Sequence, residues 1–72
     1  MDTPTQQQIT GTWKQFRGKL QEKWGDLTDD ELDRLEGKRD QIEGFIEKKT
    51  GEARQAVRDA IDEAAKETKY SL

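Results

Sequence analysis

Glycine is the residue type whose placement most constrains this chain. The six glycines form two triplets with an internal spacing of seven residues: Gly11, Gly18, Gly25, then Gly37, Gly44, Gly51. The second triplet is the first displaced by 26 residues, and the same offset pairs Phe16 with Ile42 and Leu20 with Ile46. Repetition on this scale is typical of one supersecondary unit used twice. The sequence therefore predicts an all-α fold of four helices, built as two helix-turn-helix hairpins packed roughly crosswise.

The first helix is predicted from an apolar stripe. Apolar residues recur there at steps of three and four, which places them on one helical face: Ile9, Trp13, Phe16, Leu20 and Trp24. This stripe is expected to be buried. Gly25 follows the last apolar residue, at the position of a left-handed cap, so we expect the helix to stop there.

A capping box marks the start of the second helix. Thr28 is followed three residues later by Glu31, so the helix is expected to begin at Asp29. The two staple positions that flank the box are also apolar, Leu27 and Leu32. We expect this helix to be short, to reach about residue 36, and to be broken by Gly37.

The third and fourth helices are predicted over residues 38–50 and from 52 towards 69. The third ends at Gly51 and buries Ile42, Phe45 and Ile46. The fourth has a shallow, alanine-rich inward face: Ala53, Ala56, Val57, Ala60, Ile61 and Ala64. On its solvent side Asp62 and Lys66 are spaced as a favourable ion pair. Residues 1–72 are expected to form a single domain, with residues 1–5 and 70–72 frayed.

Gly18 and Gly44 lie in helix interiors, nearly opposite the apolar stripes. A glycine there costs about 0.5–1 kcal/mol relative to alanine. We expect close packing on the other hairpin to offset this cost. The alternative is an exposed strip of bare backbone where a partner docks, and the residues of that candidate partner surface are Lys14, Arg17, Gly18, Lys19 and Gly44.

The composition removes most catalytic chemistry. The chain has no Cys and no His, so it lacks thiol nucleophiles, disulfides and the usual zinc and haem ligands. Neither twelve-residue frame through the acidic residues 26–36 places glycine where a calcium loop requires it, and a phosphate-binding loop is missing. We therefore expect no enzyme activity, no catalytic residues, no metal, no cofactor and no small-molecule substrate. Without a leader or an apolar run near the 18 residues that span a bilayer, we expect a cytoplasmic protein that does not bind membranes.

Charge is distributed unevenly along the chain. Residues 6–24 contain four basic residues against one acid, whereas residues 26–36 contain six acids against one arginine. We expect these segments to attract each other as neighbouring helices. Nucleic acid is a candidate partner because basic residues and tryptophans alternate in the first helix, but it is not favoured, since the acidic turn that follows repels phosphate.

Three stretches resemble the CsbD-like family of small bacterial stress proteins. They are Gly11-Thr-Trp-Lys-Gln-Phe-Arg-Gly18, Lys23-Trp-Gly-Asp-Leu-Thr-Asp-Asp30, and Glu36-Gly-Lys-Arg-Asp-Gln41 with Gly44 and Gly51. The resemblance implies two helical hairpins packed crosswise and induction under general stress in a bacterial cytoplasm. It implies no catalytic residue and no defined molecular activity.

The leading hypothesis is therefore a non-enzymatic, hydrophilic bacterial stress-response protein. It acts through its charged surface or through an unidentified macromolecular partner. Two alternatives stay open: a nucleic-acid-binding helical hairpin module, and a disordered, hydrophilin-like protectant. The second is favoured by the six glycines among 72 residues, by a mean hydropathy of −1.24, and by the stretch Asp62-Glu-Ala-Ala-Lys-Glu-Thr-Lys69, which resembles desiccation proteins.

Overall fold

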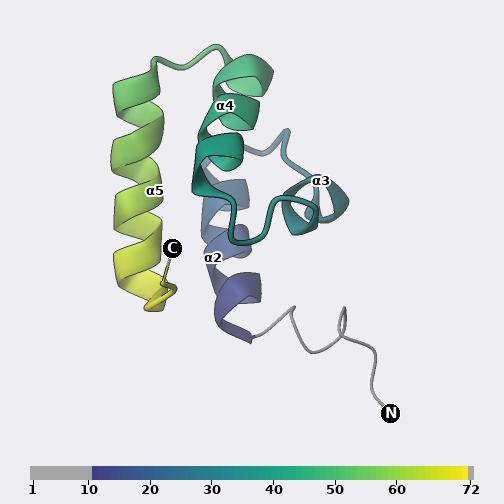
Figure 1. Ribbon diagram of the computed structural model, residues 1–72, viewed down its shortest axis with the longest axis vertical. Helices are drawn as coiled ribbons and strands as arrows, with labels where there is room; N and C mark the ends of the chain where they lie inside the picture. The colour runs from purple at the N-terminus through teal and green to yellow at the C-terminus, as the bar shows by residue number, and fades with distance from the viewer. Residues whose placement is uncertain (1–10, 72) are drawn as a thin grey trace.

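The computed structural model describes residues 11–71, and within that range the secondary structure is entirely helical (Figure 1). The four helices are α2 (Gly11–Lys23), α3 (Asp29–Asp33), α4 (Arg39–Thr50) and α5 (Arg54–Thr68). The predictions of an all-α fold and of four helices are thus confirmed for this part of the chain.

Helix α5 organises the packing of the other long helices. It lies alongside both α2 and α4 and runs in the opposite direction to each of them (Figure 1). The short helix α3 lies to one side, in the connection between α2 and α4. The core consequently forms where α5 meets the apolar stripes of α2 and α4.

The described range has eleven buried apolar side chains, which form one cluster. They are Trp13, Phe16, Leu20, Trp24, Leu27, Leu32, Ile42, Ile46, Val57, Ile61 and Ala64. The stripe predicted for the first helix is buried as expected, except that Ile9 lies outside the described residues. On α5 the inward face is narrower than predicted, because Ala53 and Ala56 are exposed while Thr68 is buried and donates its hydroxyl to the Ala64 carbonyl at 2.8 Å.

The start of α3 agrees with the capping prediction. The Thr28 hydroxyl accepts a hydrogen bond from the Glu31 N–H at 3.3 Å, and the Glu31 carboxylate accepts one from the Thr28 N–H at 3.2 Å. The helix begins at Asp29 as expected, but it ends at Asp33 rather than near residue 36. The chain continues in turns to Gly37, whose φ of 80° is the left-handed conformation that interrupts the helical path.

The two predicted glycine caps have different outcomes. Gly51 has a φ of 77° and donates its N–H to the Glu47 carbonyl at 2.8 Å, so it is a left-handed cap as predicted. The prediction is wrong for Gly25, which has no positive φ. A turn closed by the Leu27 N–H and the Trp24 carbonyl at 3.2 Å follows α2 instead. This turn brings Leu27 directly into the core, so a left-handed residue is not needed.

The chain end after α5 also corrects a prediction. Tyr70 was expected to fray, but the left-handed Lys69, with a φ of 59°, turns the chain back and the Tyr70 N–H bonds to the Ala65 carbonyl at 3.0 Å. The Tyr70 ring stacks on Phe16 with a centroid distance of 4.9 Å and lies 5.4 Å from the Trp13 ring. Tyr70 therefore closes the end of the core, while residues 1–5 and 72 lie outside the described range.

The two halves of the 26-residue repeat are unequal in the structure. Helix α3 has 5 residues, whereas α5, at the corresponding position of the second half, has 15. The left-handed Gly37 follows the turns after α3, so no long helix can continue there, whereas Glu63 occupies the corresponding position inside α5. The crosswise packing of two equivalent hairpins thus stays a prediction.

Candidate functional site

Four of the five residues of the candidate partner surface lie on α2 and the fifth, Gly44, lies on α4. The two long side chains in the middle of α2 point to different neighbours. The Arg17 guanidinium contacts Asp33 at 2.5 Å and Asp29 at 3.3 Å, and its side chain is only 14% exposed. These pairs confirm the expected attraction between the basic first helix and the acidic segment after it. They also commit Arg17 to holding α3 in place.

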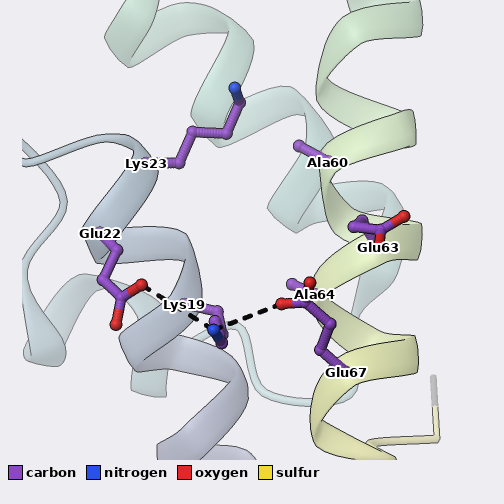
Figure 2. Close-up of a pocket in the computed structure, with 7 residues that line it drawn as sticks. All are labelled: Lys19, Glu22, Lys23, Ala60, Glu63, Ala64 and Glu67. Carbon is purple, nitrogen blue, oxygen red and sulfur yellow. Dashed lines mark ion pairs between the residues drawn. The ribbon is translucent and has the colours of Figure 1, made fainter.

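Lys19 faces the opposite neighbour, across a shallow groove between α2 and α5. Its amine lies 3.3 Å from a Glu67 carboxylate oxygen and 4.0 Å from Glu22 (Figure 2). The groove has a volume of about 400 Å³, and its lining combines small residues with charges of both signs: Lys19, Glu22, Lys23, Ala60, Glu63, Ala64 and Glu67. The structure therefore separates Arg17 from Lys19 and does not gather the predicted residues into one basic surface.

Gly18 and Gly44 overturn the packing explanation. A methyl group built on either residue meets no heavy atom within 4 Å, apart from its own helix backbone and chain neighbours. Close packing on another part of the described chain was the favoured explanation, and it is wrong. The reason is that both glycines lie on the side of their helix away from the core cluster, where α5 does not reach. Lys14, on the same helix as Gly18, is exposed.

Phe45 was predicted to point into the core, but it is only partly buried. The chain has two Phe and two Trp, and the other three are buried. Beside its ring lies a hollow of about 410 Å³ lined by Phe45, Lys48 and Lys49. The repeat could have predicted that Phe45 is partly exposed. The residue that corresponds to Phe45 in the first half of the repeat is Lys19, whose side chain reaches the surface.

Ion pairs connect α4 to its neighbours. Glu43 is 5% exposed, and its carboxylate contacts Arg39 at 2.8 Å and Arg58 at 3.7 Å. The hydrogen bond to Glu43 raises the pKa of Arg39, so that guanidinium stays charged. Arg39 also reaches Asp62 on α5 at 2.7 Å, which replaces the pair predicted between Asp62 and Lys66. These contacts hold α4 against α5.

A second ion pair joins α4 to α3. The Lys49 amine lies 3.2 Å from the Glu31 carboxylate, and this hydrogen bond lowers the pKa of Glu31 below its usual 4.5. The Glu31 carboxylate therefore binds the Lys49 amine and also accepts the Thr28 N–H that completes the capping box of α3.

Residues 11–71 contain no group of three or more His, Cys, Asp or Glu side chains that could hold a metal ion. Within the same range no helix has the length and apolar character that crossing a membrane requires.

Comparison with known proteins identifies the family. The model of the CsbD-like family matches residues 7–59. The chain belongs to the CsbD-like family. A UPF0337 protein of Pectobacterium atrosepticum is 44% identical over 63 residues, which cover 88% of this chain and 91% of that protein. The UPF0337 protein YjbJ of Salmonella typhimurium is 49% identical over 53 residues, covering 72% and 76% of the two chains. No solved structure matches the chain.

The CsbD-like match covers α2, α3 and α4 completely, but only the start of α5. Both open glycines and the hollow beside Phe45 lie within it, whereas the α5 wall of the groove in Figure 2 lies beyond it.

Within this CsbD-like region the residues of the first motif hold the fold together. The buried Trp13 ring donates its Nε1–H to the Asp33 carboxylate at 2.7 Å, and Arg17 binds the same oxygen. One carboxylate thus ties two residues of the first motif to α3. This network accounts for Trp13 and Arg17 as structural residues of the CsbD-like fold.

Proposed function

We propose that this protein is a non-enzymatic bacterial stress-response protein that binds a macromolecular partner through the outward faces of α2 and α4. The family resemblance implies the stress response. The observation that carries the binding proposal is the open space beside Gly18 and Gly44. A partner that contacts helical backbone directly explains why both helices have glycine at these positions.

The energetic argument starts from helix propensity. Each interior glycine costs its helix about 0.5–1 kcal/mol relative to alanine. Packing on another element of residues 11–71 does not offset this cost. Apart from chain neighbours and the helix's own backbone, no heavy atom lies within 4 Å of a methyl group built on either glycine. Lys14 contributes an exposed charge to the α2 face, while Arg17 and Lys19 border that face from within their ion pairs.

The test separates stability from function with one pair of substitutions. In the double variant Gly18→Ala, Gly44→Ala, alanine raises helix stability by about 1–2 kcal/mol in total, because both sites are open. The same two methyl groups obstruct a partner that touches the backbone. We therefore expect a higher melting temperature and a loss of stress survival when the variant replaces the wild-type gene in a bacterial strain.

The matched control is Glu63→Ala with Lys66→Ala. Both residues are exposed on α5, outside the proposed faces of α2 and α4, and the pair of changes leaves the net charge unaltered. This control is expected to restore survival fully. If the stabilised glycine variant restores survival equally well, binding at these faces is excluded, and a protective role of overall composition becomes the better explanation.

A further inference from the structure

Phe45 and the two lysines one turn further along α4 form an unusual surface on this chain, the Phe45 patch (Phe45, Lys48 and Lys49). A partly exposed aromatic ring among charged residues is more informative than an exposed charge, because 40% of the residues of this chain are charged. The neighbouring hollow of about 410 Å³ is bounded by that ring and by the lysine side chains.

The charge of the patch is positive. Lys48 is exposed and lies beyond 4.0 Å from any carboxylate of residues 11–71. Lys49 shares its amine with Glu31 at 3.2 Å, so the α3 acid neutralises part of the patch. Two amines on one side of an accessible ring are complementary to a ligand that combines a flat apolar face with negative charge.

We propose that the Phe45 patch binds single-stranded nucleic acid, with a base stacked on the Phe45 ring and phosphates near Lys48 and Lys49. The proposal rests on the proposed function, because it names the partner of the α4 face. Bases of a single strand expose the faces that stack on aromatic side chains, whereas a duplex hides them. The open space beside Gly44, the residue next to Phe45, lets the strand approach the helix closely.

The number of lysine amines in the Phe45 patch determines how strongly binding should depend on salt concentration. For single strands, the logarithm of the binding constant falls with log salt by about 0.7 per phosphate neutralised. The expected slope is therefore about −0.7 if Lys49 stays paired with Glu31 and about −1.4 if both lysines bind phosphate. Binding should weaken about 3- to 7-fold between 50 and 200 mM salt. The net charge of −3 repels the rest of the strand, so binding is expected to be weak and to be independent of base sequence.

The experiment is a fluorescence-anisotropy titration of a labelled oligothymidylate with the full chain and its variants. Phe45→Leu removes the stacking ring, and we expect binding to weaken roughly 5- to 150-fold. Lys48→Gln should reduce the salt slope by about 0.7, because one phosphate contact is lost. Lys66→Gln is the matched control, since Lys66 is exposed on α5, and it is expected to bind as the wild type. Circular dichroism of each variant verifies the fold, and Lys48→Gln tests the patch even if Phe45→Leu unfolds.

Four results overturn this proposal. They are no binding of the oligonucleotide by the wild type, wild-type binding by both Phe45→Leu and Lys48→Gln, equal binding of a duplex of the same length, and equally effective displacement by polyglutamate. The last result points to an acidic protein partner instead. If the oligonucleotide does not bind but the glycine variant still fails to restore survival, the proposed function stands and only its nucleic-acid partner is rejected.

Discussion

Replacing Asp33 with alanine tests the tie between α2 and α3. Its Oδ1 accepts hydrogen bonds from the Trp13 Nε1–H at 2.7 Å and from the Arg17 guanidinium at 2.5 Å. The Trp13 side chain is fully buried, whereas the Asp33 side chain is 24% exposed, so the substitution takes a charged acceptor from the indole N–H at the edge of the core. Asp33→Ala therefore removes one hydrogen bond from a buried donor and one ion pair from a largely buried guanidinium.

The magnitude follows from these two contacts. A hydrogen bond to a charged group contributes about 1.5–3 kcal/mol. Arg17 keeps its contact with Asp29 at 3.3 Å, so the lost ion pair adds at most about 1 kcal/mol. We expect Asp33→Ala to lower the free energy of unfolding by about 1.5–4 kcal/mol. For a domain of this size, that corresponds to a decrease of roughly 6–30 °C in melting temperature.

The assay is urea unfolding, followed by far-UV circular dichroism and tryptophan fluorescence. Asp33→Asn keeps an oxygen acceptor for the indole but lacks the charge, so it should lose only about 1 kcal/mol. Asp30→Ala is the control, because Asp30 is an exposed acid on the same helix, and it should lose no more than the helix-dipole contribution of about 0.3–1 kcal/mol. Equal losses for Asp33→Ala and Asp30→Ala would refute the reasoning.

Three further predictions concern chain ends and helix caps. Gly51→Ala should destabilise the fold by about 1–2 kcal/mol, because the φ of Gly51, 77°, is left-handed. Gly18→Ala should instead stabilise the fold, because Gly18 is an open helix-interior position. Thermal unfolding in which both variants shift the melting temperature in the same direction would contradict this contrast. Thr28→Ala removes the hydroxyl that accepts the Glu31 N–H, while the Glu31 carboxylate keeps its bond from the backbone N–H of residue 28. The change should reduce the free energy of unfolding by about 0.5–2 kcal/mol in urea titrations. Burial raises the pKa of Tyr70, the only tyrosine, so tyrosinate absorbance should titrate above 10.0 in the folded protein. The raised pKa favours the neutral phenol of Tyr70, so the stability that this phenol contributes is complete below pH 10.0 and is lost as the pH rises through the pKa of the folded state. An unshifted titration midpoint would show that Tyr70 does not pack on the core.

Several elements were predictable because their signals are local. The capping box at Thr28 and Glu31 set the start of α3, and the left-handed Gly51 set the end of α4, since both depend on residues within one helical turn. The apolar stripe of α2 was predictable for the same reason, because helical periodicity fixes which side chains share a face. Family membership followed from short motifs in these same segments.

The candidate site was less predictable, because its properties depend on which neighbour each side chain meets. Arg17 and Lys19 looked like one basic patch, but α3 and α5 draw them to opposite sides of α2. Close packing of Gly18 failed as an explanation because only the path of α5 decides which helix faces are covered. Phe45 has the same apolar character as a core residue, and its partial exposure depends on how α4 is rotated.

By itself the sequence determined the start of α3, the end of α4 and the apolar face of α2, because capping, glycine φ angles and helical periodicity act within a few residues. It also determined the absence of Cys and His, and with it the chemistries that this chain lacks. Only the tertiary structure decided that one Asp33 carboxylate binds Trp13 and Arg17, that Tyr70 returns to the core, and that both interior glycines stay open. Those contacts join residues distant along the chain, and local rules do not specify which distant residues will meet.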